Sequence, residues 1–95
     1  MPVALVLNEL VTNALKYAYG GGGGTVRVDL RKQADGEVCL TVRDEGVGLP
    51  ADFEERRAAS LGFRIIDGLT RQLGGRFEAR RPARGAEFAL LFRTD

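Results

Sequence analysis

The residues best suited to chemistry lie on one helix-forming segment near the amino terminus, NELVTNALKY at 8–17. Wound at 100° per residue, Glu9, Asn13 and Lys16 fall with Thr12 within about 100° of arc. A carboxylate, an amide and an ammonium on one strip suit phosphates and a hard cation, although a solvated helix face mixes such groups in the same way. The opposite side is an apolar, core-facing stripe made of Val3, Ala4, Leu7, Leu10, Val11, Ala14, Leu15 and Ala18.

A carboxylate at the end of an apolar strand is the second candidate. Asp44 continues the alternating row that runs from Val38 to Val42 and should face the helices. Leaving an ionised group there without partners costs several kcal/mol, so something must hydrogen-bond to it. Local backbone N–H groups of a turn could do so. The functional alternative is a ligand donor such as the exocyclic amine of a purine, with Gly46 and Gly48 leaving room for a flat ring.

The third candidate is Ser60-Leu61-Gly62, where a second helix is expected to begin. Free N–H groups and the positive end of the helix dipole attract phosphate at such a terminus. Gly62 would let the backbone approach closely, and Arg64 lies in the first turn. An ordinary serine N-cap is the alternative.

Length and composition limit the number of domains and the classes of partner. A chain of 95 residues allows one domain and one modest core. The charged fraction of 28% is balanced to a net charge of +1, which favours neither a nucleic-acid nor an anionic-lipid partner. The arginine-rich stretch 76–84 is interrupted by Glu78 and is expected on a solvated strand face or turn. No apolar run approaches the ~20 residues that span a bilayer, so we expect a cytosolic domain without direct membrane insertion.

Cysteine and histidine usage narrows the chemistry further. Cys39 is alone, which excludes a disulfide within the chain, and its place in an apolar run predicts a small buried side chain. The chain has no histidine, which excludes Ser-His-Asp and Cys-His catalysis within it. Phosphate chemistry would therefore use carboxylates, amides, Lys or Arg, and a hard cation such as Mg²⁺.

Hydrophobic periodicity predicts helix, strand, strand, helix, strand, strand. The helices are expected at 2 to about 17 and at about 61–73, and the strands at 25–32, 38–44, 76–80 and 86–93. The glycine run 20–24 and the segment 49–60 are expected as loops. This order predicts an α+β fold, a two-layer sandwich with helices on one face of a mostly antiparallel mixed sheet. The apolar rows expected to face inward are Val26, Val28 and Leu30 in the first strand and Leu61, Ile65, Ile66, Leu69 and Leu73 in the second helix.

The order of these features resembles the ATP-binding catalytic domain of sensor histidine kinases, within the group that includes gyrase, heat-shock protein 90 and mismatch-repair ATPases. NELVTNALKYAY is similar to the N box of that family, and DEGVGLP to its first glycine box. SLGFRIIDGLTRQLGG is similar to its second glycine box and the helix that follows. The sequences of these segments are most similar to those of the histidine-kinase branch with a variant dimerisation domain, the HWE type. The resemblance covers nearly the whole chain and implies a Bergerat-type ATP-binding fold over residues 1–95.

The resemblance implies roles for the N box. Asn13 would coordinate Mg²⁺ bridging the ATP phosphates, with Asn8 and Glu9 near the metal and its waters. Glu9 would be the general base or would orient water. Lys16 would pair with a phosphate, and Tyr17 would lie against the sugar or base.

The glycine boxes would complete the nucleotide site. Asp44 would accept from the adenine amine, while Gly46 and Gly48 would shape the adenine pocket. Leu61 and Gly62 would let the start of the helix approach the phosphates. The loop 49–60 would be a short lid, with Arg56 and Arg57 available to the phosphates.

The chain departs from the family pattern in several places. The family has a strand and a helix before the N box, so we expect a truncated domain with a sheet edge and part of the core cover missing. Ser60 stands where many kinases have glycine, and Ala86 stands where the family often has threonine. Losing that hydroxyl should weaken nucleotide affinity by about 1 kcal/mol.

Three functions follow as hypotheses. The first is an ATP·Mg²⁺-binding catalytic domain that donates the γ-phosphate to a histidine on a separate dimerisation domain, which in turn serves a response regulator. The second is an anti-sigma-factor-type kinase that phosphorylates a protein serine. The third is a non-catalytic interaction module.

Overall fold

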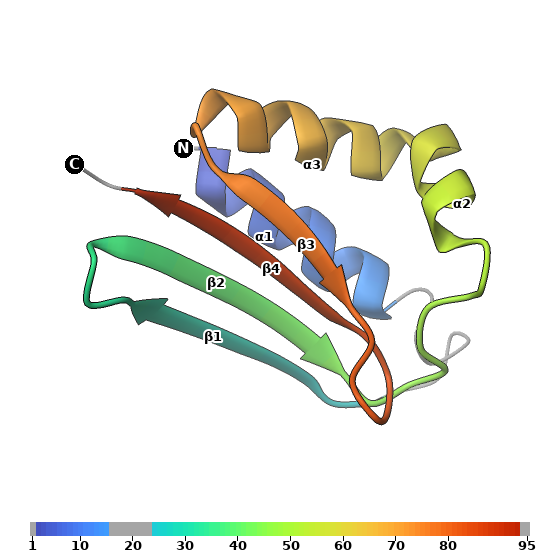
Figure 1. The fold of residues 1–95 in the computed structure, drawn as a ribbon. Coiled ribbons are helices and arrows are strands. Elements are labelled where there is room, and N and C mark those ends of the chain that lie inside the picture. Colours follow the sequence, from blue (N-terminus) through green and yellow to red (C-terminus); the bar gives the residue numbers. More distant parts are fainter. Residues whose placement is uncertain (1, 16–23, 94–95) are drawn as a thin grey trace.

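The computed structural model describes residues 2–15 and 24–93. Three helices and four strands lie within these ranges (Figure 1). The elements are α1 (Pro2–Asn13), β1 (Val26–Lys32), β2 (Glu37–Asp44), α2 (Phe53–Ala59), α3 (Leu61–Gln72), β3 (Arg76–Arg80) and β4 (Glu87–Arg93).

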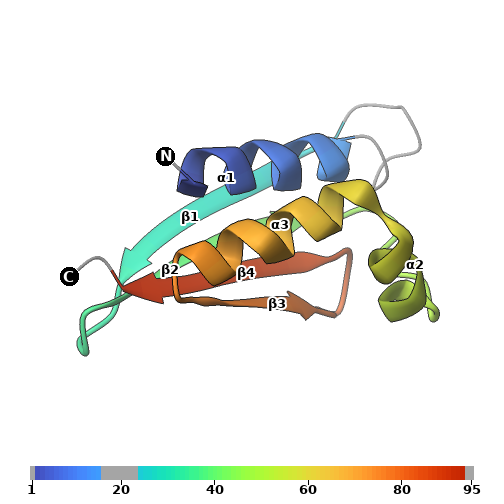
Figure 2. The ribbon, with the colours of Figure 1, turned by 90° about the horizontal axis from the view of Figure 1, so that it is seen from above.

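The strands form one sheet in the order β1-β2-β4-β3. Every pairing among the described residues is antiparallel. Figure 2 shows α1 and α3 side by side over one face of this sheet. The expected α+β sandwich with its helices on one face is therefore confirmed, and a tight turn ending at Gly36 joins β1 to β2.

The core lies between the two long helices and the sheet. Its most deeply buried side chains come from α1, α3, β2 and β4. On α1 the buried face follows Val6, Leu10 and Ala14, whereas Ala4 and Leu15 of the expected stripe are exposed. Apolar residues surround most of this helix, so the sequence pattern alone did not fix its rotation. The five largest fully buried side chains are Leu10, Ile66, Leu90, Val6 and Val42.

The inward face of α3 also differs from the expected stripe. Leu61 and Ile65 are 71% and 42% exposed, while Phe63, Ile66 and Thr70 are buried. Phe63 packs edge-on against Phe53 of α2, with ring centroids 5.3 Å apart. This aromatic contact sets the rotation of the helix and turns Leu61 outward.

The segment expected as a loop contains α2, so that expectation was wrong. The helix has no apolar stripe, but Phe53 anchors it in the core against Phe63 and Phe88. Glu54 and Glu55 lie in its first turn and its arginines in the last, which suits the helix dipole. One aromatic contact and favourable charge placement thus stabilise a helix that periodicity does not detect.

The expected burial of two strand residues on β1 and of Cys39 on β2 was also wrong. β1 is an edge strand, and its helix-side residues Val28 and Leu30 are 47% and 63% exposed. They lie beside Val42 and Leu40, which the helices do cover. Cys39 points to the opposite face of β2 and is only half-buried.

Candidate functional site

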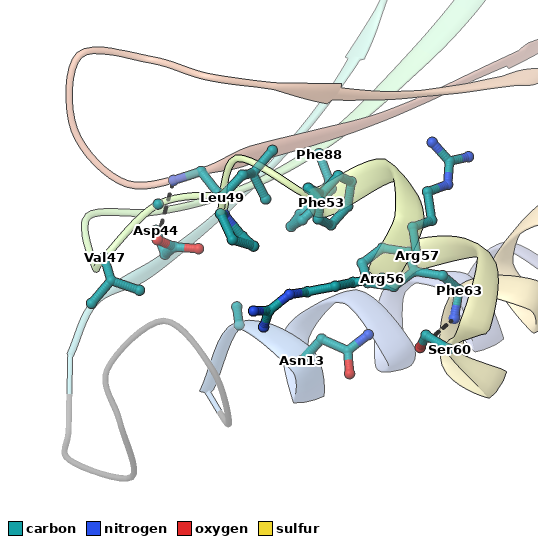
Figure 3. A pocket seen from close by; sticks show the side chains of 14 residues that line it. Asn13, Asp44, Val47, Leu49, Phe53, Arg56, Arg57, Ser60, Phe63 and Phe88 are labelled. Carbon is teal, nitrogen blue, oxygen red and sulfur yellow. Dashed lines mark hydrogen bonds between the residues drawn. The ribbon is translucent and has the colours of Figure 1, made fainter.

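A cavity of about 540 Å³ opens beside the carboxyl end of β2, between α1 and the α2 segment (Figure 3). Its size is within the range of small-molecule sites. Its walls are mostly apolar, with polar groups at opposite sides. Its lining comprises Asn13, Ala14, Asp44, Val47, Gly48, Leu49, Pro50, Phe53, Arg56, Arg57, Ser60, Phe63, Ala86 and Phe88.

Asp44 is the buried carboxylate of this cavity, only 3% exposed. Its Oδ1 accepts hydrogen bonds from the backbone N–H of Gly46 at 3.0 Å and of Ala86 at 3.2 Å. Both bonds from described residues end on the same oxygen, and the carboxylate faces the cavity in Figure 3. The local turn therefore holds Asp44 without using all of its acceptor capacity.

Two glycines bring the loops around Asp44 into close contact. Gly85 has φ +76°, and a Cβ there would lie only 2.0 Å from the Asp44 carbonyl oxygen. Gly48 has φ +78°, and a Cβ there would lie 3.1 Å from the Gly85 carbonyl oxygen. The turn before β4 consequently packs directly on the end of β2, which brings the Ala86 N–H to the carboxylate.

Polar groups of α1 meet the beginning of α3 at the other side of the cavity. A Cβ on Gly62 would lie 3.3 Å from Glu9 Oε2 and 3.6 Å from Asn13 Nδ2. Asn13 Nδ2 is buried and has no hydrogen-bond partner among the described residues. Because the two ends of an amide are assigned from their hydrogen bonds, this amide can present either its oxygen or its nitrogen to a ligand. Gly62 thus leaves space beside the Glu9 carboxylate and the Asn13 amide.

Ser60 caps α3, as the structural alternative for this residue predicted. Its Oγ accepts from the N–H of Phe63 at 3.4 Å, and its side chain also lines the cavity. The first turn of a helix still has further N–H groups without intrahelical partners. Capping by Ser60 and an anion near the helix start are therefore compatible.

The two arginines of α2 have different surroundings. Arg57 pairs with Asp67 of α3 at 2.6 Å and lies over the ring of Phe77, 5.0 Å from its centroid. Figure 3 shows the Arg56 side chain extending across the cavity toward α1, whereas Arg57 turns away. Arg56 also hydrogen-bonds to Asp52 at 3.0 Å, which lowers the pKa of that carboxyl. Arg56 is therefore the arginine available to a bound anion.

The structure brings together most of the residues that the sequence singled out. Asn13, Asp44 and Gly48 line the cavity, and Glu9 and Gly62 adjoin Asn13. Gly46 holds Asp44 through its N–H. In contrast, Asn8 and Leu61 are exposed and do not line the cavity. Lys16 and Tyr17 lie outside the described residues.

Sequence reasoning missed the apolar walls of the cavity. Val47, Leu49 and three phenylalanines supply most of them. Four of the five phenylalanines pack in one cluster beneath it, and that cluster was not foreseen because its members are far apart in the chain. The ring pairs are Phe53–Phe63, Phe53–Phe88, Phe63–Phe77, Phe63–Phe88 and Phe77–Phe88.

The donor set fits a cation that is shared with a ligand. Among residues 2–15 and 24–93, no three His, Cys, Asp or Glu side chains gather to hold a metal. Mg²⁺ usually takes one or two protein oxygens and completes its shell with waters and substrate phosphates. Asn13 and Glu9 match that requirement, since Asn13 Nδ2 is buried without a partner among the described residues and lies near Gly62, as does the Glu9 carboxylate.

This fold and site define an ATPase class. Residues 1–95 match the family described as histidine kinase-, DNA gyrase B- and HSP90-like ATPase, and the chain belongs to that family. Family membership implies that the chain binds ATP. Among the described residues, none of the helices has the length and hydropathy required to cross a membrane.

The relatives include histidine kinases and anti-sigma F factors. The blue-light-activated histidine kinase 2 of Erythrobacter litoralis is 30% identical over 84 residues, which are 87% of this chain and 24% of the relative. The anti-sigma F factor of Geobacillus stearothermophilus is 46% identical over 77 residues, covering 68% of this chain and 51% of the relative. The chain therefore spans about a quarter to a half of these relatives.

Two solved structures have the same fold as this chain. The histidine kinase domain of a blue-light-activated kinase from Erythrobacter litoralis superposes with a TM-score of 0.85 at 27% identity. That match covers 96% of this chain and 42% of the other. The ATP-binding domain of PrrB from Mycobacterium tuberculosis, at 22% identity and a TM-score of 0.78, shares the fold.

Proposed function

We propose that this chain is the catalytic domain of a two-component sensor histidine kinase, which binds ATP with Mg²⁺ and donates the γ-phosphate to a histidine on a separate dimerisation domain. The phosphate then passes to a response regulator. One observation carries the proposal: Asp44 and Asn13, which are distant in sequence, line one cavity.

Asp44 would recognise the base. The carboxylate is fixed by two backbone N–H groups and keeps acceptor capacity toward the cavity. An adenine amine can donate to it, while the apolar walls enclose the ring. Gly46 and Gly48 would keep side chains out of this end of the cavity.

The α1–α3 side would hold the phosphates. Asn13 would supply an oxygen to Mg²⁺, and Glu9 would orient a nearby water or act as general base. When bound, the cation would neutralise charge on the phosphates. The space at Gly62 and the positive end of α3 favour phosphate close to these groups. Arg56 would add positive charge from α2.

Such a site suits phosphoryl transfer because that reaction depends on positioning and charge stabilisation. The chain has no histidine, so the phosphate acceptor would belong to another domain. Lys16 and Tyr17 would contribute a cation and a stacking surface, as the N-box resemblance implies.

Isothermal titration with a non-hydrolysable ATP analogue and Mg²⁺ tests nucleotide binding. Asp44→Asn turns an acceptor into a donor that opposes the adenine amine, and should weaken binding at least about tenfold. Asp35→Asn removes the same charge at the β1–β2 turn and should leave affinity unchanged. A folded sample that binds no nucleotide would favour a non-catalytic interaction module. Equal affinities in both variants would contradict the role of Asp44.

A serine kinase is the second candidate, because the anti-sigma F factor of Geobacillus stearothermophilus is 46% identical over the matched segment. A phosphotransfer assay distinguishes histidine kinase activity from serine kinase activity. The chain would be incubated with labelled ATP and either a histidine-bearing dimerisation domain or a serine-bearing acceptor protein. Acid-labile label on the first supports the histidine kinase, and acid-stable label on the second supports the serine kinase.

A further inference from the structure

One member of the arginine-rich stretch 76–84 contacts a wall of the cavity from outside. Arg81 lies in the turn between β3 and β4, and its side chain is exposed. Its Nη1 donates to the Leu49 carbonyl at 2.8 Å, and its Nη2 donates to the Pro50 carbonyl at 2.9 Å. Leu49 and Pro50 line the cavity, whereas Arg81 does not. One guanidinium therefore holds two successive peptide groups of the cavity wall.

The shape of the guanidinium suits this contact. Its N–H groups form a planar, rigid fork, and here the two terminal nitrogens donate to separate carbonyl oxygens. Hydrogen bonds from a charged donor are also stronger than those between neutral groups. Arg81 therefore fixes the orientation of Leu49 relative to Pro50, which a single hydrogen bond would not do.

The wall that Arg81 contacts has little regular structure to hold it in place. Residues 45–50 belong to no helix or strand, and Val47 is 82% exposed. Pro50 has no N–H and cannot donate to a neighbouring strand. The position of this segment consequently depends on contacts from other parts of the chain.

The Pro50 carbonyl is also the point from which α2 begins. It accepts from the N–H of Phe53, the first residue of α2, at 3.1 Å. A carbonyl oxygen has two lone pairs, so it can accept from Phe53 and Arg81 together. Arg81 thus stabilises both the wall and the start of the helix that carries Arg56 across the cavity.

The turn that contains Arg81 also contacts the end of β2. The Ala86 N–H donates to Asp44, and Gly85 packs against Gly48. Figure 1 shows this turn beside the segment that follows β2. The β3–β4 turn therefore supports the segment from the end of β2 to the start of α2, and Arg81 supplies the support nearest to α2.

We propose that Arg81 is a positioning residue of the nucleotide site, which fixes Leu49 and Pro50 as a wall for the adenine ring. This inference rests on the proposed function of the cavity. Figure 3 shows Leu49 on the same side of the cavity as Asp44, so the wall serves the base and not the phosphates. If the segment without Arg81 keeps the binding arrangement about one fifth of the time, the apparent affinity falls about fivefold.

Titration calorimetry with three variants tests the proposal. Arg81→Gln removes the fork and should weaken binding of a non-hydrolysable ATP analogue with Mg²⁺ about fivefold, and binding of ADP by the same factor. Arg81→Lys keeps the charge without the fork and should also bind more weakly than the parent. Arg84→Gln is the matched control, because it removes one charge from the same turn and Arg84 is exposed and does not line the cavity. Its affinity should equal that of the parent.

Different results identify different errors. Parental affinity in Arg81→Gln overturns the role of Arg81 and leaves the proposed function intact. Parental affinity in Arg81→Lys, equal weakening in Arg84→Gln, or a loss that grows with the number of phosphates would assign the effect to charge and overturns the positioning role. A folded parent chain that binds no nucleotide overturns the proposed function, and the inference with it.

Hydrogen exchange without nucleotide tests the contact itself. The Phe53 amide should exchange at least about threefold faster in Arg81→Gln, because the carbonyl that accepts from it is less firmly held. The amide of Leu90, in the interior strand β4, should exchange at the parental rate. Faster exchange at both amides would indicate a general loss of stability, and unchanged exchange at Phe53 would show that Arg81 does not hold this wall. Either result overturns the proposal.

Discussion

Ala86 and Asp44 hold each other through two hydrogen bonds at the end of the sheet. The Ala86 N–H donates to Asp44 Oδ1 at 3.2 Å, and the Asp44 N–H donates to the Ala86 carbonyl at 3.0 Å. Gly85 allows this approach because any Cβ there would collide with the Asp44 backbone. Main-chain groups therefore fix the carboxylate that faces the cavity, without a side-chain hydroxyl at position 86.

A hydroxyl at position 86 should increase the affinity of the site around Asp44 for nucleotide. Ala86 is buried and lines the cavity next to Asp44, so Ala86→Thr can donate a further hydrogen bond to the carboxylate. We expect about fivefold tighter binding of an ATP analogue, which corresponds to about 1 kcal/mol. Ala86→Val adds nearly the same volume without the hydroxyl and should not tighten binding. Equal effects of the two substitutions, measured by titration calorimetry, would show that volume matters and the hydrogen bond does not.

Two glycines of α3 should respond differently to alanine. A Cβ at Gly62 would crowd Glu9 at 3.3 Å and fill the space beside Asn13, so Gly62→Ala should weaken Mg²⁺-dependent nucleotide binding severalfold. Gly68 has nothing within 4 Å of an added Cβ. Gly68→Ala should leave binding unchanged and raise the free energy of unfolding by about 1 kcal/mol. Calorimetry and urea unfolding distinguish the two, and normal binding by Gly62→Ala would contradict the proposed phosphate side.

Substitution of the two α2 arginines should affect different properties, the stability of the fold for one and nucleotide binding for the other. Arg57 joins α2 to Asp67 and covers Phe77, so Arg57→Gln should lower the free energy of unfolding by about 1–2 kcal/mol. Among the described side chains, Arg56 forms an ion pair only with the exposed Asp52, so Arg56→Gln should hardly change stability. It should instead weaken binding of the triphosphate more than binding of the nucleoside. If Arg56→Gln destabilises the fold as much as Arg57→Gln, the assignment of the two roles is wrong.

Lowering the pH should remove one contribution to the free energy of unfolding, which comes from Glu78 on β3. Hydrogen bonds from Arg80, and then Arg76, hold the pKa of Glu78 below its ordinary value of 4.5, although burial acts the other way. A lowered folded-state pKa stabilises the fold above the ordinary value, and this stabilisation is lost as the pH falls through the folded-state pKa. The side chain is 39% exposed, so solvent screening limits the effect at neutral pH to less than about 1 kcal/mol.

Glu78→Gln should therefore be less stable than the parent at pH 7, with the difference vanishing toward pH 3. Urea unfolding across this pH range measures it. A difference that persists at low pH would assign the effect to packing and not to charge.

Much of the fold followed from local patterns. Alternation of Val38, Leu40 and Val42 predicted β2, and alternation of Val26, Val28 and Leu30 predicted β1. The polar strip of α1 and the carboxylate at the end of β2 were recognisable because helical and strand periodicities assign residues to faces. The short α2 was not recognisable, since Phe53 is stabilised by rings that lie far away in the chain.

The sequence by itself determined the types of all elements except α2, the family and the residues of three separate motifs. The tertiary structure decided that Asp44 and Asn13 share one cavity and that Leu61 points outward. It also decided that Arg56 extends across the cavity while Arg57 pairs with Asp67. It also left Val28 and Leu30 uncovered at the sheet edge. The physical reason is that periodicity fixes which residues share a face, whereas packing between distant elements fixes what that face meets.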